Sequence, residues 1–120
     1  MNETLCKNNS YIINSFEQAK IAAKKNRGSS LSLVSAIDSA KYSGPSFFLG
    51  IKNELEKVYK NLEIKMWIDC GKSTGLAMNV IREGGKNIIF RDTSISAIRE
   101  MAETQNVEII DSISDVIDLS

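Results

Sequence analysis

The densest group of chemically reactive side chains in this sequence lies in residues 69–75, which read Asp-Cys-Gly-Lys-Ser-Thr-Gly. The run contains a carboxylate and a thiol, followed by an ammonium group and two hydroxyls between two glycines, directly before an apolar stretch typical of a helix. The free N–H groups at a helix N-terminus favour anions, so the run has the composition of an anion-binding loop. It is not a phosphate-binding P-loop, because it lacks the earlier glycine of the Gly-x-x-x-x-Gly-Lys-Ser/Thr pattern.

The reactive side chains of this run each have a structural alternative. Asp69 ends an apolar strand, so its carboxylate is either a functional group at the mouth of a sheet or an acceptor for backbone N–H groups of the next turn. Cys70 is either a nucleophile or soft ligand, or an inert thiol. The chain has no histidine to deprotonate it, which favours the inert thiol. Lys72 is a single flexible lysine, and Schiff-base chemistry would require its burial.

A second polar pair, Arg91 and Asp92, directly follows the next apolar strand. Ligands of parallel sheets and barrels collect at the carboxyl ends of the strands. If the two strands are neighbours, Arg91 lies near Asp69 and either forms an ion pair with it or recognises an anion. We therefore assign Asp69 as the candidate catalytic acid or base. The candidate ligand-binding residues are Asn14, Ser35, Cys70, Gly71, Lys72, Ser73, Thr74, Arg91 and Asp92.

Strands and helices that can position these residues alternate along the chain. Apolar runs typical of strands cover residues 11–13, 31–36, 65–69, 87–90 and 107–110. Helical spacing is found in residues 16–27, 48–62, 76–82 and 95–102, with Asn14 or Ser15 and Thr93 or Ser94 as caps and Gln18 completing a capping box. Residues 38–45 are predicted as a loop, and residues 112–120 follow no single pattern. The alternation predicts an α/β fold with a parallel sheet of about four to five strands, either a half-barrel or a flavodoxin/Rossmann-like layer.

Length and composition limit the class of protein. With 120 residues the chain is far shorter than the roughly 250 residues of a complete (β/α)₈ barrel, and we expect a polar arm in residues 1–10 and one domain in residues 11–120. The formal net charge is zero, which argues against binding to nucleic acid or an anionic membrane. The lack of histidine removes the commonest metal ligand and proton shuttle, so we expect no metal and no cofactor. Two widely spaced cysteines and the lack of a long apolar run favour a cytoplasmic protein.

Residues 11–110 resemble the N-terminal half of class II fructose-bisphosphate aldolases, a family of metal-dependent TIM barrels. Residues 11–20 look like the family's first strand and turn, and residues 33–36 with 40–44 look like its second strand and its Ala-Arg-Lys-Tyr-Ala-Gly-type loop. Residues 66–71, Met-Trp-Ile-Asp-Cys-Gly, are similar to the family's Leu-His-Leu-Asp-His-Gly strand. Residues 83–92 are similar to its next glycine turn and strand.

The resemblance implies a fold and an ancestry, but it also implies the loss of the reaction. Asp69 falls on the family's catalytic acid, Cys70 falls on a metal-binding histidine, and the serine that contacts substrate falls on Ala36 or, with one gap, Ser35. The other metal ligands of the family lie in its second half, which has no counterpart in this sequence. A single thiolate does not hold a catalytic divalent ion, so we expect no metal-dependent aldolase activity.

The function we expect is the binding of a small polar or phosphorylated metabolite at the carboxyl ends of the strands. Two alternatives are a protein-interaction module without a ligand, and a metal-independent lyase or isomerase that uses Asp69 with Lys72 or Arg91. A half-barrel leaves open sheet edges and an apolar face, which must be covered by a second copy, by flattening of the sheet or by the terminal segments. We favour a homodimer.

Overall fold

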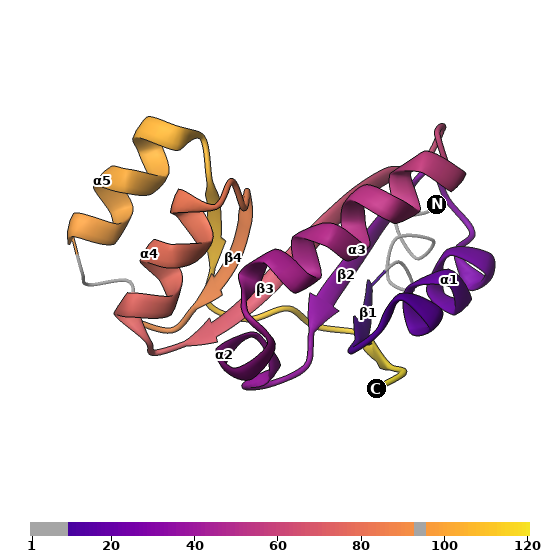
Figure 1. Cartoon of the computed structure of the whole chain (residues 1–120), viewed down its shortest axis with the longest axis horizontal. Helices are drawn as coiled ribbons and strands as arrows, with labels where there is room; N and C mark the ends of the chain where they lie inside the picture. Colours follow the sequence, from indigo (N-terminus) through magenta and orange to yellow (C-terminus); the bar gives the residue numbers. More distant parts are fainter. Residues whose placement is uncertain (1–9, 93–95) are drawn as a thin grey trace.

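The computed structural model describes residues 10–92 and 96–120 and shows an α/β fold built on a six-stranded, all-parallel sheet (Figure 1). The strands are β1 (Ser10–Ile13), β2 (Ser30–Ser35), β3 (Glu63–Gly71), β4 (Asn87–Phe90), β5 (Glu108–Ile110) and β6 (Ile117–Asp118). The helices are α1 (Phe16–Lys25), α2 (Ser39–Ser43), α3 (Pro45–Val58), α4 (Thr74–Arg82) and α5 (Ser96–Gln105). The predicted fold class is confirmed. The predicted arm lies outside the described residues except for Ser10, which begins β1.

The strand order is β5-β4-β3-β2-β1-β6. From β1 to β5 each strand lies beside its predecessor, which is the order of half a (β/α)₈ barrel, and right-handed crossovers then place every helix on the same face. The chain next returns across the sheet and adds β6 to the far side of β1, as a doubly wound sheet does at its switch point. The fold is therefore compatible with both predicted architectures.

The main core lies between the helices and one face of the sheet. Each helix contributes to it, through Ala19, Ala40, Phe48, Val80 and Ile98 from α1 to α5 in turn. The strands alternate, so that Leu33, Met66, Ile68 and Ile88 face this core while Val34, Trp67 and Ile89 face the other way. In α3, Phe48, Ile51 and Leu55 are buried at three- and four-residue steps.

The start of α1 agrees with the sequence prediction. The Ser15 hydroxyl caps α1 by accepting from the Gln18 N–H at 3.2 Å, and the Gln18 side chain accepts from the Asn14 N–H at 2.6 Å. This is a capping box displaced by one residue, since its reciprocal bond comes from the residue before the cap. Thr93 and Ser94, the predicted caps of α5, lie outside the described residues.

Three predicted boundaries are wrong. The loop predicted for residues 38–45 contains α2, a five-residue helix with one buried side chain and therefore no apolar stripe to reveal it. The long helix begins at Pro45, which fits the first turn of a helix, and it ends at Val58, before Leu62. The third strand runs from Glu63 to Gly71, two residues longer at each end than predicted.

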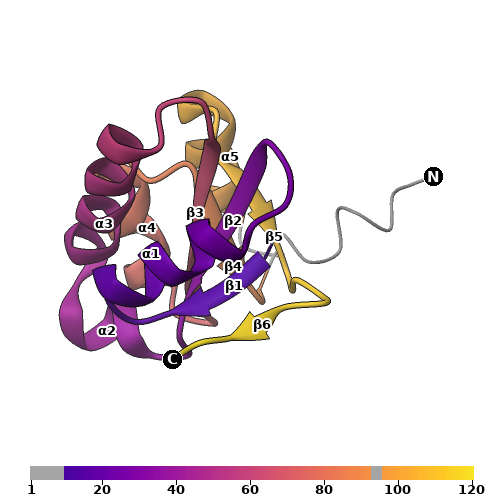
Figure 2. The ribbon, with the colours of Figure 1, turned by 90° about the vertical axis from the view of Figure 1, so that its right-hand side faces the viewer.

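The face of the sheet opposite the helices is covered by the chain itself. Residues 111–116, called the strap from here on, lead from β5 to β6 on the side away from α3 and α4 (Figure 2). Ile113 and Val116 of the strap pack on a second, smaller core of Val34, Trp67 and Ile89. The sequence allowed three ways to cover the open face of a half-barrel. In the structure a terminal segment, the strap, covers it. The homodimer stays a prediction. No helix among the described residues is long and apolar enough to cross a membrane.

Candidate functional site

A pocket of about 250 Å³ opens at the carboxyl ends of the central strands, under the strap. Its polar lining consists of Ser35, Asp69, Arg91 and Ser112, and its apolar lining of Ile12, Val34, Ile37, Ile89, Ile113 and Val116. These residues come from four strands or strand ends and from the strap. The pocket lies where parallel sheets bind ligands, because the strands all point toward this rim.

The pocket contains an ion pair between Asp69 and Arg91. Arg91 Nη1 lies 2.8 Å from Asp69 Oδ1 and Arg91 Nη2 lies 3.2 Å from Asp69 Oδ2, so the guanidinium binds both carboxylate oxygens. The Asp69 side chain is 7% exposed and that of Arg91 is 39% exposed. The prediction that the two residues meet at one rim of a parallel sheet is confirmed, and the ion pair predicted as one alternative for Arg91 is present.

A β-bulge brings the two side chains together. The register of β3 against β4 shifts between Asp69 and Gly71, and the Arg91 N–H donates to the Gly71 carbonyl at 2.7 Å. Gly71 has a φ of +56°, a conformation that residues with a Cβ adopt at a cost. Bulges of this kind redirect side chains at sheet ends, and here the bulge allows the residue that follows β4 to reach back to Asp69.

The Asp69 carboxylate and backbone are held from three sides. Its Oδ1 accepts the Gly71 N–H at 2.9 Å in addition to Arg91, and its own N–H donates to the hydroxyl of the buried Ser35 at 2.9 Å. Asp69 therefore acts as the turn acceptor that the sequence left open, while it also lines the pocket. Charge-assisted bonds of this type are the stronger class of hydrogen bond, so they fix the position of the carboxylate.

The charge of Arg91 is stabilised by its surroundings. Its hydrogen bond to Asp69 raises the pKa of the guanidinium, and the negative charges of Asp69 and Asp111 raise it further against an opposing effect of burial. Arg91 thus remains a permanent cation at the pocket. The bidentate pair uses two of the five N–H donors of a guanidinium and leaves the others for further acceptors.

Cys70 lies on the opposite face of the sheet from Asp69. Its side chain is 3% exposed in the helix-facing core, and its Sγ donates to the Ile68 carbonyl at 3.7 Å. Burial, followed by the charge of Asp69, raises the pKa of the thiol to about 12. A protonated thiol is neither a nucleophile nor a metal ligand, so Cys70 has the properties of the inert thiol. The residue that the aldolase resemblance places on a metal-binding histidine points away from the pocket.

The loop after β3 does not contribute to the pocket lining. The Ser73 hydroxyl caps α4 by accepting from the Leu76 N–H at 3.2 Å, Lys72 is exposed, and Thr74 begins the helix. Asn14 supplies its backbone N–H to the capping box of α1. Asp92 follows Arg91 but does not line the pocket. Of the predicted site residues, the structure brings Ser35, Asp69 and Arg91 together in the pocket lining, and the backbone of Gly71 bonds to both Asp69 and Arg91.

Two features of the site were not predicted from the sequence: the aliphatic side chains that line the pocket, and the strap. Ile12, Val34 and Ile89 could be found as the outward members of the alternating strands. Ser112, Ile113 and Val116 gave no usable signal, because the strap has neither a helical nor a strand period.

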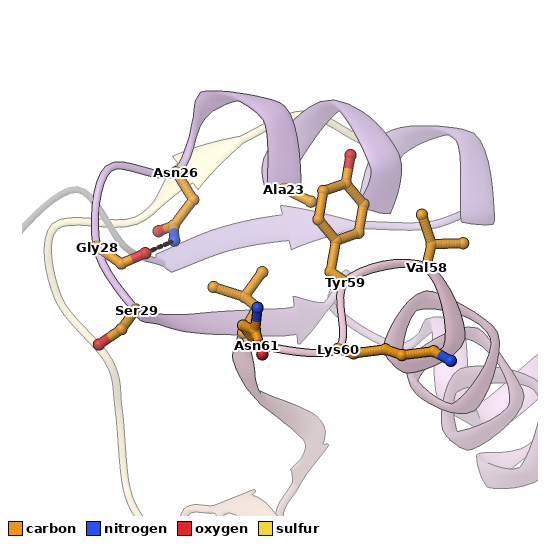
Figure 3. Close-up of a pocket in the computed structure, with 9 residues that line it drawn as sticks. Ala23, Asn26, Gly28, Ser29, Val58, Tyr59, Lys60 and Asn61 are labelled. Carbon is orange, nitrogen blue, oxygen red and sulfur yellow. Dashed lines mark hydrogen bonds between the residues drawn. The ribbon is translucent and has the colours of Figure 1, made fainter.

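A second pocket, of about 420 Å³, lies at the other end of the strands (Figure 3). It is formed where α1 and α3 end and β2 and β3 begin, from Ala23, Asn26, Gly28, Ser29, Val58, Tyr59, Lys60, Asn61 and Leu62. Asn26 Nδ2 donates to the Gly28 carbonyl at 2.8 Å, and its Oδ1 has no hydrogen-bond partner among the described residues. Because it lies at the amino ends of the strands, we place the candidate site at the smaller pocket.

Within the described residues there is no group of three or more histidine, cysteine, aspartate or glutamate side chains placed to hold a metal ion. Comparison of the chain with family models, with curated proteins and with solved structures finds no match. The resemblance to class II aldolases stays a prediction.

Proposed function

We propose that this chain binds a small polar metabolite carrying a phosphate or carboxylate group in the pocket at the carboxyl ends of β1 to β4. The observation that carries the proposal is the position of Arg91. Asp69 holds its guanidinium by two hydrogen bonds at the pocket wall, while the side chain stays 39% exposed. A guanidinium oriented in this way presents its remaining N–H groups to the paired oxygens of a carboxylate or phosphate.

The lining of the pocket supports a compact ligand with two different ends. Asp69, Arg91 and Ser35 offer a polar region, while six isoleucine and valine side chains offer an aliphatic region. The volume of about 250 Å³ is slightly below the roughly 300–1,000 Å³ of ordinary ligand pockets. A molecule of a few carbon atoms with one anionic group fits this description.

The same geometry supports binding rather than metal-dependent aldol cleavage. The Asp69 carboxylate is already engaged by Arg91 and by the Gly71 N–H, so it serves to position the guanidinium. The Cys70 thiol faces the helices and stays protonated.

The proposal is tested by thermal unfolding in the presence of sugar phosphates, nucleotides, inorganic phosphate and short carboxylic acids. A ligand at 100 times its Kd stabilises the native state by about 2.7 kcal/mol, which raises Tm by roughly 10 °C for a domain of this size. Arg91→Ala should abolish the shift, and Arg82→Ala, which removes an exposed arginine at the end of α4, should retain it. A shift that is equal in both variants contradicts the proposed site.

A second candidate function is self-association, favoured by exposed apolar side chains around α2. Ile37 is 74% exposed, Tyr42 83% and Phe47 43%. Three large apolar side chains exposed within eleven residues are typical of an interface, and the half-barrel order favours a second copy as the partner. Sedimentation equilibrium should then show a dimer that Tyr42→Lys converts to a monomer. A monomeric wild-type chain at high concentration excludes this alternative.

A further inference from the structure

We infer that the strap, residues 111–116, together with β6, opens and closes over the pocket while the rest of the sheet stays folded. This inference rests on the proposed function, because it concerns access to the same pocket. The strap forms one wall of that pocket through Ser112, Ile113 and Val116. A ligand that enters from the strap side meets this wall first.

Among the described residues, the strap and β6 are held by a short ladder, by half-buried side chains and by the charge of Asp111 near Arg91. β6 pairs with β1 through two residues, Ile117 and Asp118, and the N–H of Leu119 donates to the Ile12 carbonyl at 2.9 Å. By contrast, β2 and β3 are paired over five residues. The apolar anchors of the strap, Ile113 and Val116, are only half-buried. Segments with short ladders and few buried side chains open locally at lower free energy than core strands.

The strap also contains a backbone conformation that is uncommon outside glycine, although aspartate adopts it more readily than most residues. Asp115 has a φ of +57°, in the left-handed region that favours glycine. The strap must also cross the whole sheet. Seven residue steps from Ile110 to Ile117 reach at most about 25 Å, and five spacings between neighbouring strands amount to about 24 Å in a flat sheet. Because Asp115 is left-handed rather than extended, the strap is close to its maximum length. It therefore spans the sheet only because the curvature of the sheet brings β5 and β6 closer together.

The size of the pocket supports opening. With the strap closed, the volume of about 250 Å³ leaves room only for a compact ligand, and Trp67 beneath the strap is 4% exposed. Displacing Ile113 and Val116 uncovers Val34, Trp67 and Ile89 and enlarges the pocket toward β1. Closure after binding then shields the ligand from water.

Trp67 is the single tryptophan of the chain and lies under the strap, so its fluorescence reports on strap opening. The experiment measures acrylamide quenching in the full chain and in Leu119→Ala, which weakens the anchor after β6 without changing the pocket lining. The matched control is Leu62→Ala. Both leucines are partly buried against the same main core, but Leu62 lies at the amino end of β3. We expect Leu119→Ala to raise the quenching constant severalfold and Leu62→Ala to leave it near the wild-type value. Equal quenching in both variants overturns the inference.

Hydrogen exchange of the wild-type chain gives an independent readout that does not depend on the folding of a variant. The Leu119 amide should exchange at least roughly a hundredfold faster than the amides of the β2–β3 ladder, since local opening precedes global unfolding. Exchange at the rate of that ladder overturns the inference. Either result is obtained without ligand. If the strap stays closed but ligands give Arg91-dependent thermal shifts, the inference of strap opening fails and the proposed function stands. If the strap opens but no ligand gives such shifts, the proposed function fails and the inference of strap opening stands.

Discussion

The guanidinium of Arg91 binds both carboxylate oxygens of Asp69, at 2.8 and 3.2 Å, across two neighbouring parallel strands. Asp69 belongs to β3 and Arg91 directly follows β4, so the pair ties together the carboxyl ends of the two strands. It also orients the guanidinium that we propose binds an anion. The stability of the rim and the proposed binding therefore depend on the same contact.

Replacing Arg91 should destabilise the protein. Arg91→Ala leaves the buried Asp69 carboxylate with the Gly71 N–H but without its counter-ion, and we expect a loss of about 2 kcal/mol in the free energy of unfolding. The expected loss is smaller than for a fully buried ion pair because Arg91 is 39% exposed. Urea denaturation measures it, with Arg82→Ala expected within about 0.5 kcal/mol of the wild type. The double variant with Asp69→Ala should show a coupling of at least about 1 kcal/mol, and additive effects would contradict the pairing.

The buried thiol of Cys70 should make stability fall at high pH. Its folded pKa of about 12 lies above the value of 9.0 for a free thiol, so between these pH values the native state binds the proton more tightly than the unfolded state. Stability from this group is complete below about pH 9 and decreases toward pH 12, with a slope of up to about 1.4 kcal/mol per pH unit.

Cys70→Ala provides the comparison for this pH dependence. Urea denaturation of both proteins from pH 8 to pH 11 should give curves that converge as the pH rises. In a Cys6→Ser background, Cys70 should also react with iodoacetamide only after unfolding. Parallel stability curves, or rapid labelling of the native chain at pH 8, would argue that the thiol is accessible.

Two glycines that flank the loop after β3 should respond oppositely to substitution by alanine. Gly71 has a φ of +56°, so Gly71→Ala is strained and should cost about 1–2 kcal/mol, although the nearest atom to an added Cβ is Arg91 Nη1 at 4.0 Å. Gly75 lies in α4 without a positive φ and with open space around an added Cβ, so Gly75→Ala should stabilise by about 0.5–1 kcal/mol. Thermal unfolding of both variants measures the difference. Equal changes in Tm for the two variants would contradict the left-handed conformation of Gly71 in the bulge.

Sequence patterns predicted the parallel sheet and the meeting of Asp69 with Arg91, because each of the two residues ends or follows a clear apolar strand. They placed both Asp69 and Cys70 in the candidate site, although the two are adjacent in sequence and so face opposite sides of the sheet. Which of the two lines the pocket depends on which face the helices cover. The strap was beyond local reasoning, since Ile113 and Val116 are ordered by tertiary contacts with Val34, Trp67 and Ile89 rather than by any period of their own. The short helix α2 was not predicted, because its single buried residue, Ala40, does not form the apolar stripe that indicates a helix.

The most direct test of metabolite binding at the carboxyl rim is an NMR titration of the ¹⁵N-labelled chain with inorganic phosphate and with the best compound from the thermal screen. We expect saturable shifts of the Arg91 Nε–H signal and of the backbone amides of Ser35, Asp69 and Ser112. Shifts confined to Asn26, Ser29 and Asn61, in the pocket at the amino ends of the strands, would contradict the proposed binding, as would the absence of saturable shifts for every compound in the panel.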